Sequence, residues 1–166
     1  MEQKNILIVG MGSDFHTDEG IGVKMVSKLS ADPYFQKLSF KTESLFSLVT
    51  LDSIKGYKTV VFIDGMNQNM NPPGHISIHS LFDFQETLHL KNIHEMNFRD
   101  CFTFWKKLEY QIPENVFVIS IEVDDFLSFG SKLSPKLSKS FDENLNQVKS
   151  WIHHLSISDK CMLIPA

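Results

Sequence analysis

The stretch that most constrains the fold runs from Asn5 to Gly22 and reads NILIVGMGSDFHTDEGIG. An apolar run at residues 6–9 predicts a buried strand, and it ends in the glycine turn Gly10-x-Gly12. The acidic pair Asp18-Glu19 then opens a predicted helix, whose apolar face is Ile21, Met25, Val26 and Leu29. In open α/β sheets, this order places polar residues beyond the carboxyl end of the strand, where ligands bind. The stretch therefore predicts an α/β fold with a site near Glu19.

Other interpretations of the same stretch involve nucleotides or no ligand at all. A dinucleotide-binding fingerprint needs a third glycine near position 15, where the chain has Phe15. A phosphate-binding P-loop needs a Gly-Lys-Ser/Thr ending, and the acidic residues here would repel a phosphate. In a purely structural interpretation, Thr17 or Asp18 caps the helix and Glu19 is a first-turn carboxylate favoured by the helix dipole. The choice is thus between a carboxylate site and a helix cap.

Composition indicates one globular domain over residues 1–166, although residues 156–166 show no readable pattern. The 166 residues are 42% hydrophobic and 22% charged, which is ordinary for a chain that buries one core. A net charge of −4 gives no electrostatic reason to bind nucleic acid or an anionic membrane. There is no signal-peptide pattern, and no apolar run approaches the roughly 20 residues of a spanning helix. We expect a cytoplasmic monomer.

The two cysteines, Cys101 and Cys161, show neither CxxC spacing nor a disulfide framework. Cys101 lies on a helical apolar stripe, which predicts a small core residue. Cys161 lies in the tail and could be a free thiol.

A second carboxylate follows the clearest buried strand, KTVVFI at Lys58 to Ile63. Asp64-Gly65 comes directly after it. If this strand and the first one are parallel neighbours, Asp64 and Glu19 lie at the same edge of the sheet. The structural alternative is an aspartate that starts a turn before a glycine.

The remaining chain alternates between predicted strands and helices. Strands are predicted at residues 36–43, 75–79 and 114–123. The strand at 75–79 has one face open to water, which predicts an antiparallel strand or one at the edge of the sheet. A short helix is predicted within Ser44 to Ile54, with its inward residues at Leu45, Leu48, Val49 and Leu51. The last helix should begin with Ser134 as N-cap and Pro135 as first residue. Its apolar face, spaced at 3.6 residues, comprises Leu137, Phe141, Leu145, Val148, Ile152 and Leu155.

Histidines supply the candidate nitrogen ligands. His94-Glu95 is predicted to start a helix with its apolar positions at Phe98, Cys101, Phe102, Trp105 and Leu108. In a first helical turn, the dipole disfavours the charged imidazole and so keeps His94 able to bind a metal. His75 and His79 share one strand face and could also bind a metal, but exposed histidines on amphipathic strands are commoner. We leave those two unassigned.

Taken in order, these motifs resemble the hydrogenase maturation endopeptidases. That family opens with GxGNxxxxD(D/E)GxG after an apolar strand, and a later strand ends in aspartate before a loop that closes with Pro-Gly. Here Asp64 and the Pro73-Gly74 pair match the second motif. The family's His-Glu or His-Gln pair fits His94-Glu95-Met96 better than Leu88-His89-Leu90, so His89 is the alternative. Its closing Gly-x-x-Leu-Ser-Pro fits residues 130–135.

Some positions depart from the family pattern. Ser13 stands where the family has asparagine, and Ser120 and Val123 stand where it has glycine and proline around Ile-Glu. His16 occupies a position that is usually apolar. It is either a fourth ligand or a surface residue.

The resemblance implies a three-layer αβα fold with a mostly parallel, twisted sheet of about five strands and helices on both faces. It implies an aspartic-type endopeptidase that removes the C-terminal extension of a [NiFe] hydrogenase large-subunit precursor after nickel insertion. Glu19, Asp64 and His94 would bind nickel supplied by the substrate, with cadmium or zinc as substitutes, and a carboxylate, Glu19 or Asp64, would activate water. Asp18 would be a cap or a group behind the ligands.

Two other functions stay open. One is a diverged, non-catalytic member that acts as a metal-responsive chaperone or binding module, which the changes at Ser13 and Ser120 would permit. The other is a different hydrolase on the same scaffold, such as a peptidyl-tRNA hydrolase-like enzyme, although the acidic balance argues against tRNA.

Overall fold

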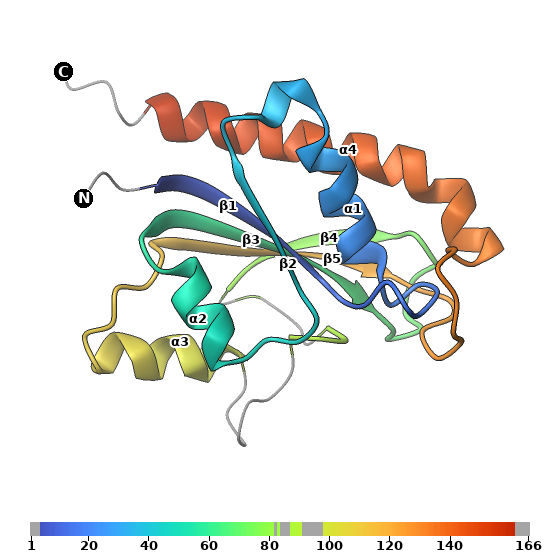
Figure 1. Ribbon diagram of the computed structural model, residues 1–166, viewed down its shortest axis with the longest axis horizontal. Helices are drawn as coiled ribbons and strands as arrows, with labels where there is room; N and C mark the ends of the chain where they lie inside the picture. Colours follow the sequence, from blue (N-terminus) through green and yellow to red (C-terminus); the bar gives the residue numbers. More distant parts are fainter. Residues whose placement is uncertain (1–3, 82, 84–86, 91–97, 162–166) are drawn as a thin grey trace.

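The computed structural model of the chain describes residues 4–81, 83, 87–90 and 98–161, which form a five-stranded sheet between two layers of helices (Figure 1). The strand order is β2-β1-β3-β5-β4. The first four of these strands are parallel, and β4 pairs antiparallel with β5. The strands are β1 (Lys4–Met11), β2 (Ser39–Glu43), β3 (Tyr57–Met66), β4 (Ile76–Ser80) and β5 (Asn115–Glu122). The predicted mostly parallel sheet and its antiparallel edge strand are confirmed.

Helices cover both faces of the sheet, as predicted. In Figure 1, α1 and α4 lie on one face, while α2 and α3 lie on the other. Successive residues of β3 alternate between these layers, so Val61 and Ile63 pack beneath α1 and α4 and Phe62 packs beneath α2 and α3. The helices are α1 (Ile21–Ser30), α2 (Leu48–Ile54), α3 (Phe98–Lys107) and α4 (Pro135–Cys161). None of the described helices is both long and apolar enough to cross a membrane.

The core beneath α2 and α3 is aromatic. Phe46 meets the edge of Phe98 at a ring-centroid distance of 4.5 Å, and Phe98 in turn meets Phe62 at 5.3 Å. Such edge-to-face pairs are each worth roughly 0.5–1.5 kcal/mol beyond the area they bury. Cys101 is buried in the same cluster, which confirms it as a core residue. Burial and the charge of Asp100 raise the pKa of its thiol.

The structure corrects the inward face predicted for residues 44–54. Leu45 and Val49 are 57% and 72% exposed, and Phe46 is the buried residue. For Leu45, the physical reason is that α2 begins only at Leu48, so helical spacing does not apply to residues 44–47. Val49 lies within α2, on the side of the helix that faces solvent. Leu51 is half-buried against the core, and the side chain of Leu48 lies outside the described part.

Other element ends also differ from the prediction. Leu108 lies just beyond α3 and is 52% exposed, although the other predicted positions of that helix are buried. The last helix begins at Pro135 as predicted but continues to Cys161, whose side chain lies outside the described part. The first helix begins at Ile21 with Gly20 as its cap, so neither Asp18 nor Glu19 is in its first turn.

The strand register brings three strand ends to one edge of the sheet. Gly10 of β1 pairs with Ile63 of β3, and Asp64 pairs with Ser120 of β5. Two glycines let α1 approach that edge closely. A Cβ at Gly12, where φ is +120°, would overlap the Glu19 carbonyl oxygen, and a Cβ at Gly22 would overlap that of Ile63. Glu19 is thereby held beside the end of β3.

Candidate active site

Asp64 is the buried centre of the site. It ends the apolar run of β3, has no exposed surface, and accepts four hydrogen bonds from the segment at residues 87–90. The Thr87 hydroxyl (2.5 Å) and the backbone N–H groups of His89 (2.9 Å) and Leu90 (3.2 Å) donate to Oδ2. The fourth contact joins Oδ1 to His89 Nδ1 at 2.6 Å. One carboxylate therefore fixes both the backbone and the ring of His89.

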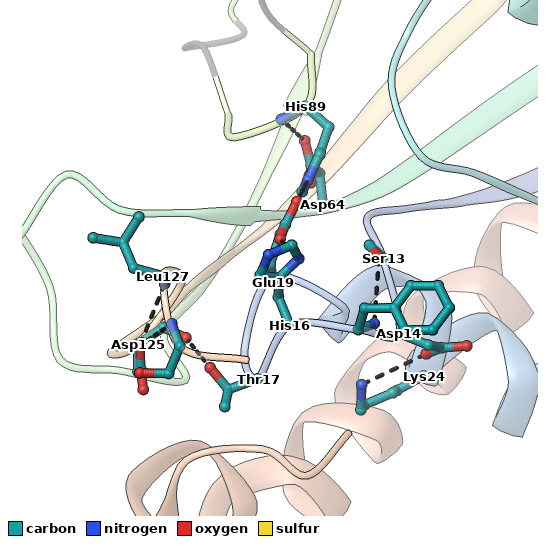
Figure 2. Close-up of polar contacts among 12 residues, drawn as sticks. Ser13, Asp14, His16, Thr17, Glu19, Lys24, Asp64, His89, Asp125 and Leu127 are labelled. Atoms are coloured by element: carbon teal, nitrogen blue, oxygen red, sulfur yellow. Dashed lines mark hydrogen bonds and ion pairs between the residues drawn. The ribbon is translucent and has the colours of Figure 1, made fainter. Parts of the chain in front are cut away.

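His89 links Asp64 to Glu19, as Figure 2 shows. Its Nε2 lies 2.8 Å from Glu19 Oε1, so each ring nitrogen faces a carboxylate oxygen. Only the doubly protonated imidazolium can donate a hydrogen bond from both nitrogens. The pair of contacts therefore favours the charged ring.

The pKa of His89 follows from opposing effects. Burial of the ring, the largest single effect, lowers its pKa because a charged group is poorly solvated there. The hydrogen bonds and charges of Asp64, and then those of Glu19, raise it and together outweigh burial. The pKa of His89 therefore lies above its usual value.

Glu19 lies between two imidazoles. His16 Nδ1 is 2.5 Å from Glu19 Oε2, although without hydrogen-bond alignment. The Glu19 side chain is 21% exposed, whereas Asp64 is fully enclosed. Of the two carboxylates, Glu19 is the one that an incoming ligand can reach.

Asp18 has a different role from its neighbour. It is fully buried and accepts hydrogen bonds from the backbone N–H groups of Asp124 (3.2 Å), Asp125 (2.9 Å) and Ser134 (2.7 Å). It makes no side-chain hydrogen bond as a cap of α1. The structure thus corrects the helix-cap interpretation: the Asp18 side chain connects the loop after β1 to the segment that follows β5.

Glu122, at the end of β5, is a further buried carboxylate on the same face of the sheet as Asp64. Its Oε1 accepts the backbone N–H groups of Gln68 (2.8 Å) and Asn69 (3.0 Å). It thereby fixes the start of the loop after β3. In the sequence, Glu122 stands out only as part of the Ile-Glu pattern of the resembled family.

The serines that depart from the family pattern make local contacts. Ser120 donates its hydroxyl to the Ser77 carbonyl of β4 at 3.3 Å. Ser13 accepts the backbone N–H of Phe15 at 3.3 Å and so shapes the loop after β1. Both hydroxyls are used within the fold.

The structure brings two of the predicted site residues together and leaves a third undescribed. Glu19 and Asp64 converge at one edge of the sheet, joined by His89. His94 lies outside the described residues. His75, directly before the edge strand β4, is exposed, and His79, within β4, is half-buried.

His89, the alternative imidazole in the sequence, carried only a weak signal. It stands between two leucines outside any helical period, and Leu90 is fully buried. The hydrogen bond of 2.9 Å from Leu88 N to the Gly65 carbonyl lays this segment against the end of β3. The sequence feature that could have indicated its place in the site is the Leu88-His89-Leu90 triplet, a histidine between two apolar residues after a polar stretch.

The arrangement can hold charge and move protons. Asp64 orients His89, His89 donates toward Glu19, and Glu19 is partly open to solvent. No three His, Cys, Asp or Glu side chains within the described ranges form a ready-made metal site. In the described geometry, the His89 ring fills the space between the two carboxylates.

Comparison with known proteins supports the fold. No protein family model and no curated protein sequence matches the chain. Among solved structures, it is similar to the hydrogenase maturating endopeptidase HybD from E. coli, with 18% identity, a TM-score of 0.69, and coverage of 90% of this chain and 93% of that one. It is also similar to the [NiFe] hydrogenase maturation protease HybD from Thermococcus kodakarensis, with 16% identity, a TM-score of 0.64, and coverage of 89% and 98%. A third similar structure is a hydrogenase 3 maturation protease, with 18% identity, a TM-score of 0.65, and coverage of 89% of this chain and 90% of that one. The chain therefore has the α/β fold of hydrogenase maturation endopeptidases.

Proposed function

We propose that this protein is an endopeptidase that removes the C-terminal extension of a [NiFe] hydrogenase large-subunit precursor after nickel insertion. The observation that carries the proposal is the Glu19–His89–Asp64 chain of contacts at the carboxyl edge of the sheet. Ligands bind at this edge in open α/β sheets. The functions of the similar proteins of this fold suggest the reaction, and the sequence motifs agree with it.

In this proposal, the nickel ion belongs to the substrate. Carboxylate oxygens and neutral imidazole nitrogens are suitable donors for nickel or zinc, so the residues fit such an ion once the His89 ring has released its Nε2 proton to water. Glu19 is the first carboxylate that the arriving ion meets, because it is the accessible one. Asp64 holds the Nδ1 side of the His89 ring, the usual arrangement by which a carboxylate orients a histidine ligand.

Peptide hydrolysis also needs a base for the attacking water. Glu19 is suited to this role because it is partly exposed, so that water can reach it, and its carboxylate can itself take the proton that the attacking water loses. Asp64 is less suited, since its two oxygens already accept four hydrogen bonds. The aspartic-type mechanism is thus proposed with Glu19 at the reacting centre and Asp64 behind His89.

The test is cleavage of a nickel-loaded large-subunit precursor by the purified protein. Wild type should shorten the precursor, and Glu19→Gln should lower the rate by about 100-fold or more, because a general base typically contributes 10²–10⁴-fold. Glu143→Gln, which changes an exposed carboxylate on α4, is the matched control and should cleave normally. If wild type binds the precursor without cleaving it, the chain is a non-catalytic binding module instead.

The choice of imidazole needs a separate measurement. Calorimetric titration with Ni²⁺ or Cd²⁺ should show weaker binding for Glu19→Gln and for His89→Ala if His89 is a ligand. If His94→Ala alone weakens binding, then His94 is the ligand and His89 only joins the carboxylates. Equal binding by all three variants and wild type would remove the metal from this site.

A further inference from the structure

An exposed aromatic ring stands beside the candidate active site. Phe129 is 84% exposed and lies in the segment between β5 and α4. Its ring packs on the His16 ring, with centroids 4.8 Å apart. His16 in turn contacts Glu19 at 2.5 Å. Phe129 is therefore joined to the accessible carboxylate through a single side chain.

The backbone around Phe129 is fixed by hydrogen bonds. His16 and Phe129 form an antiparallel bridge, flanked by Thr17 N to Ser128 O (3.1 Å) and Gly130 N to Phe15 O (3.0 Å). Residues directly opposite each other between two such bonds bring their side chains close together. The ring thus keeps its place against His16 while most of its surface stays in water.

The same segment is anchored at its start. Asp125 accepts the backbone N–H groups of Leu127 (3.3 Å) and Ser128 (3.0 Å), and Asp18 accepts that of Asp125 itself. Figure 2 shows the contacts of Asp125 with Thr17 and Leu127 beside His16 and Glu19. A ring that is already held in position loses little conformational entropy when a partner covers it.

We propose that Phe129 is a substrate-binding residue, which contacts an apolar side chain of the polypeptide next to the bond that is cleaved. This inference rests on the proposed endopeptidase function and names the polypeptide precursor as the occupant. Phe129 is continuous, through His16, with the reacting centre, so a polypeptide bound there for cleavage would contact its ring. Pre-positioned aromatic residues commonly dominate binding energy at protein interfaces.

The experiment compares Phe129→Ala with Phe15→Ala on the nickel-loaded precursor. Phe15 is a matched control because it adjoins His16 in sequence and is 80% exposed, while the ring that packs against His16 is that of Phe129. Phe129→Ala should raise KM by roughly ten-fold with kcat within about two-fold, since burial of a Phe side chain stabilises a complex by that order. Phe129→Leu should restore most of the affinity, and Phe15→Ala should match wild type.

A binding measurement separates recognition from turnover. In a Glu19→Gln background, Phe129→Ala should weaken binding of the precursor by a similar factor, as followed by fluorescence anisotropy. If wild type cleaves and Phe129→Ala keeps the wild-type KM and affinity, Phe129 does not bind substrate, and the proposed function stands. If both phenylalanine variants lose affinity equally, the effect is general and the inference is wrong. If wild type neither binds nor cleaves the precursor, both proposals fail.

Discussion

Asp64 combines full burial with four accepted hydrogen bonds, so its replacement should be costly. In Asp64→Asn, the amide NH₂ group cannot accept hydrogen bonds, so some of the groups that now donate to the Asp64 carboxylate would lose their acceptor. Each buried donor left without a partner costs about 1–3 kcal/mol. We expect the free energy of unfolding in urea to fall by about that amount. Asp52→Asn, an exposed carboxylate on α2, is the control and should change stability little. An unaltered stability for Asp64→Asn would mean that the contacts with residues 87–90 contribute nothing.

The raised pKa of His89 makes stability depend on pH. The unfolded side chain titrates near 6.5, and the folded one titrates higher because Asp64 and Glu19 outweigh burial. Folding therefore favours the protonated ring. The resulting stabilisation is fully present below about pH 6.5 and is lost as the pH rises through the folded pKa.

Comparison with His89→Gln isolates this contribution, since the other six of the seven histidines remain in both proteins. The difference in unfolding free energy between wild type and His89→Gln should shrink as the pH rises above about 6.5, measured by urea unfolding at several pH values. A difference that is constant with pH would show that His89 is not held as the imidazolium.

At this scale, the sequence indicated that the two carboxylates lie close together, but it did not indicate the contacts that His89 makes with them. Asp64 directly follows one apolar run and Glu19 lies in the loop after another, so their proximity follows from the pattern if the two strands are parallel neighbours. The place of His89 depends instead on Thr87, His89 and Leu90 donating to one buried carboxylate 25 residues or so away along the chain. Periodicity contains no information about such a contact.

At the scale of elements, Asp18 ties the loop after β1 to the segment between β5 and α4. Asp18→Asn should lose part of the set of three backbone hydrogen bonds and lower the unfolding free energy by about 1–3 kcal/mol. Hydrogen exchange should become faster at the amides of Asp125 and Ser134, while that at Val118 within β5 should keep its relative protection. Asp142→Asn on the exposed side of α4 is the control. Unchanged exchange at those amides would contradict the role assigned to Asp18.

Elements with strong periodicity were predicted well, and those governed by their neighbours were not. The apolar faces of α1 and α4 and the buried runs of β1 and β3 appear directly in the sequence. The residues before α2 follow a different rule. Phe46 is drawn inward by the aromatic cluster on α3, far along the chain, and Leu45 turns out to solvent as a result.

At the scale of the whole molecule, the distance between α1 and the sheet sets the spacing of the site. Gly22 is the contact point, because a Cβ there would overlap the Ile63 carbonyl oxygen and crowd the Met11 backbone. Glu19 lies three residues before Gly22, and Asp64 directly follows Ile63. A displacement of α1 would therefore move one carboxylate relative to the other.

Gly22→Ala tests this coupling of fold and site. Overpacking against backbone atoms typically costs 1–3 kcal/mol, so we expect a loss of stability in that range. The longer Glu19–His89 contact should also lower the pKa of His89 toward its usual value, which NMR titration of the ring would show. Ser27→Ala, on the exposed side of α1, changes the same helix without approaching the sheet and should leave both quantities unaltered. If Gly22→Ala destabilises the protein but leaves the His89 pKa unchanged, the site adjusts independently of α1.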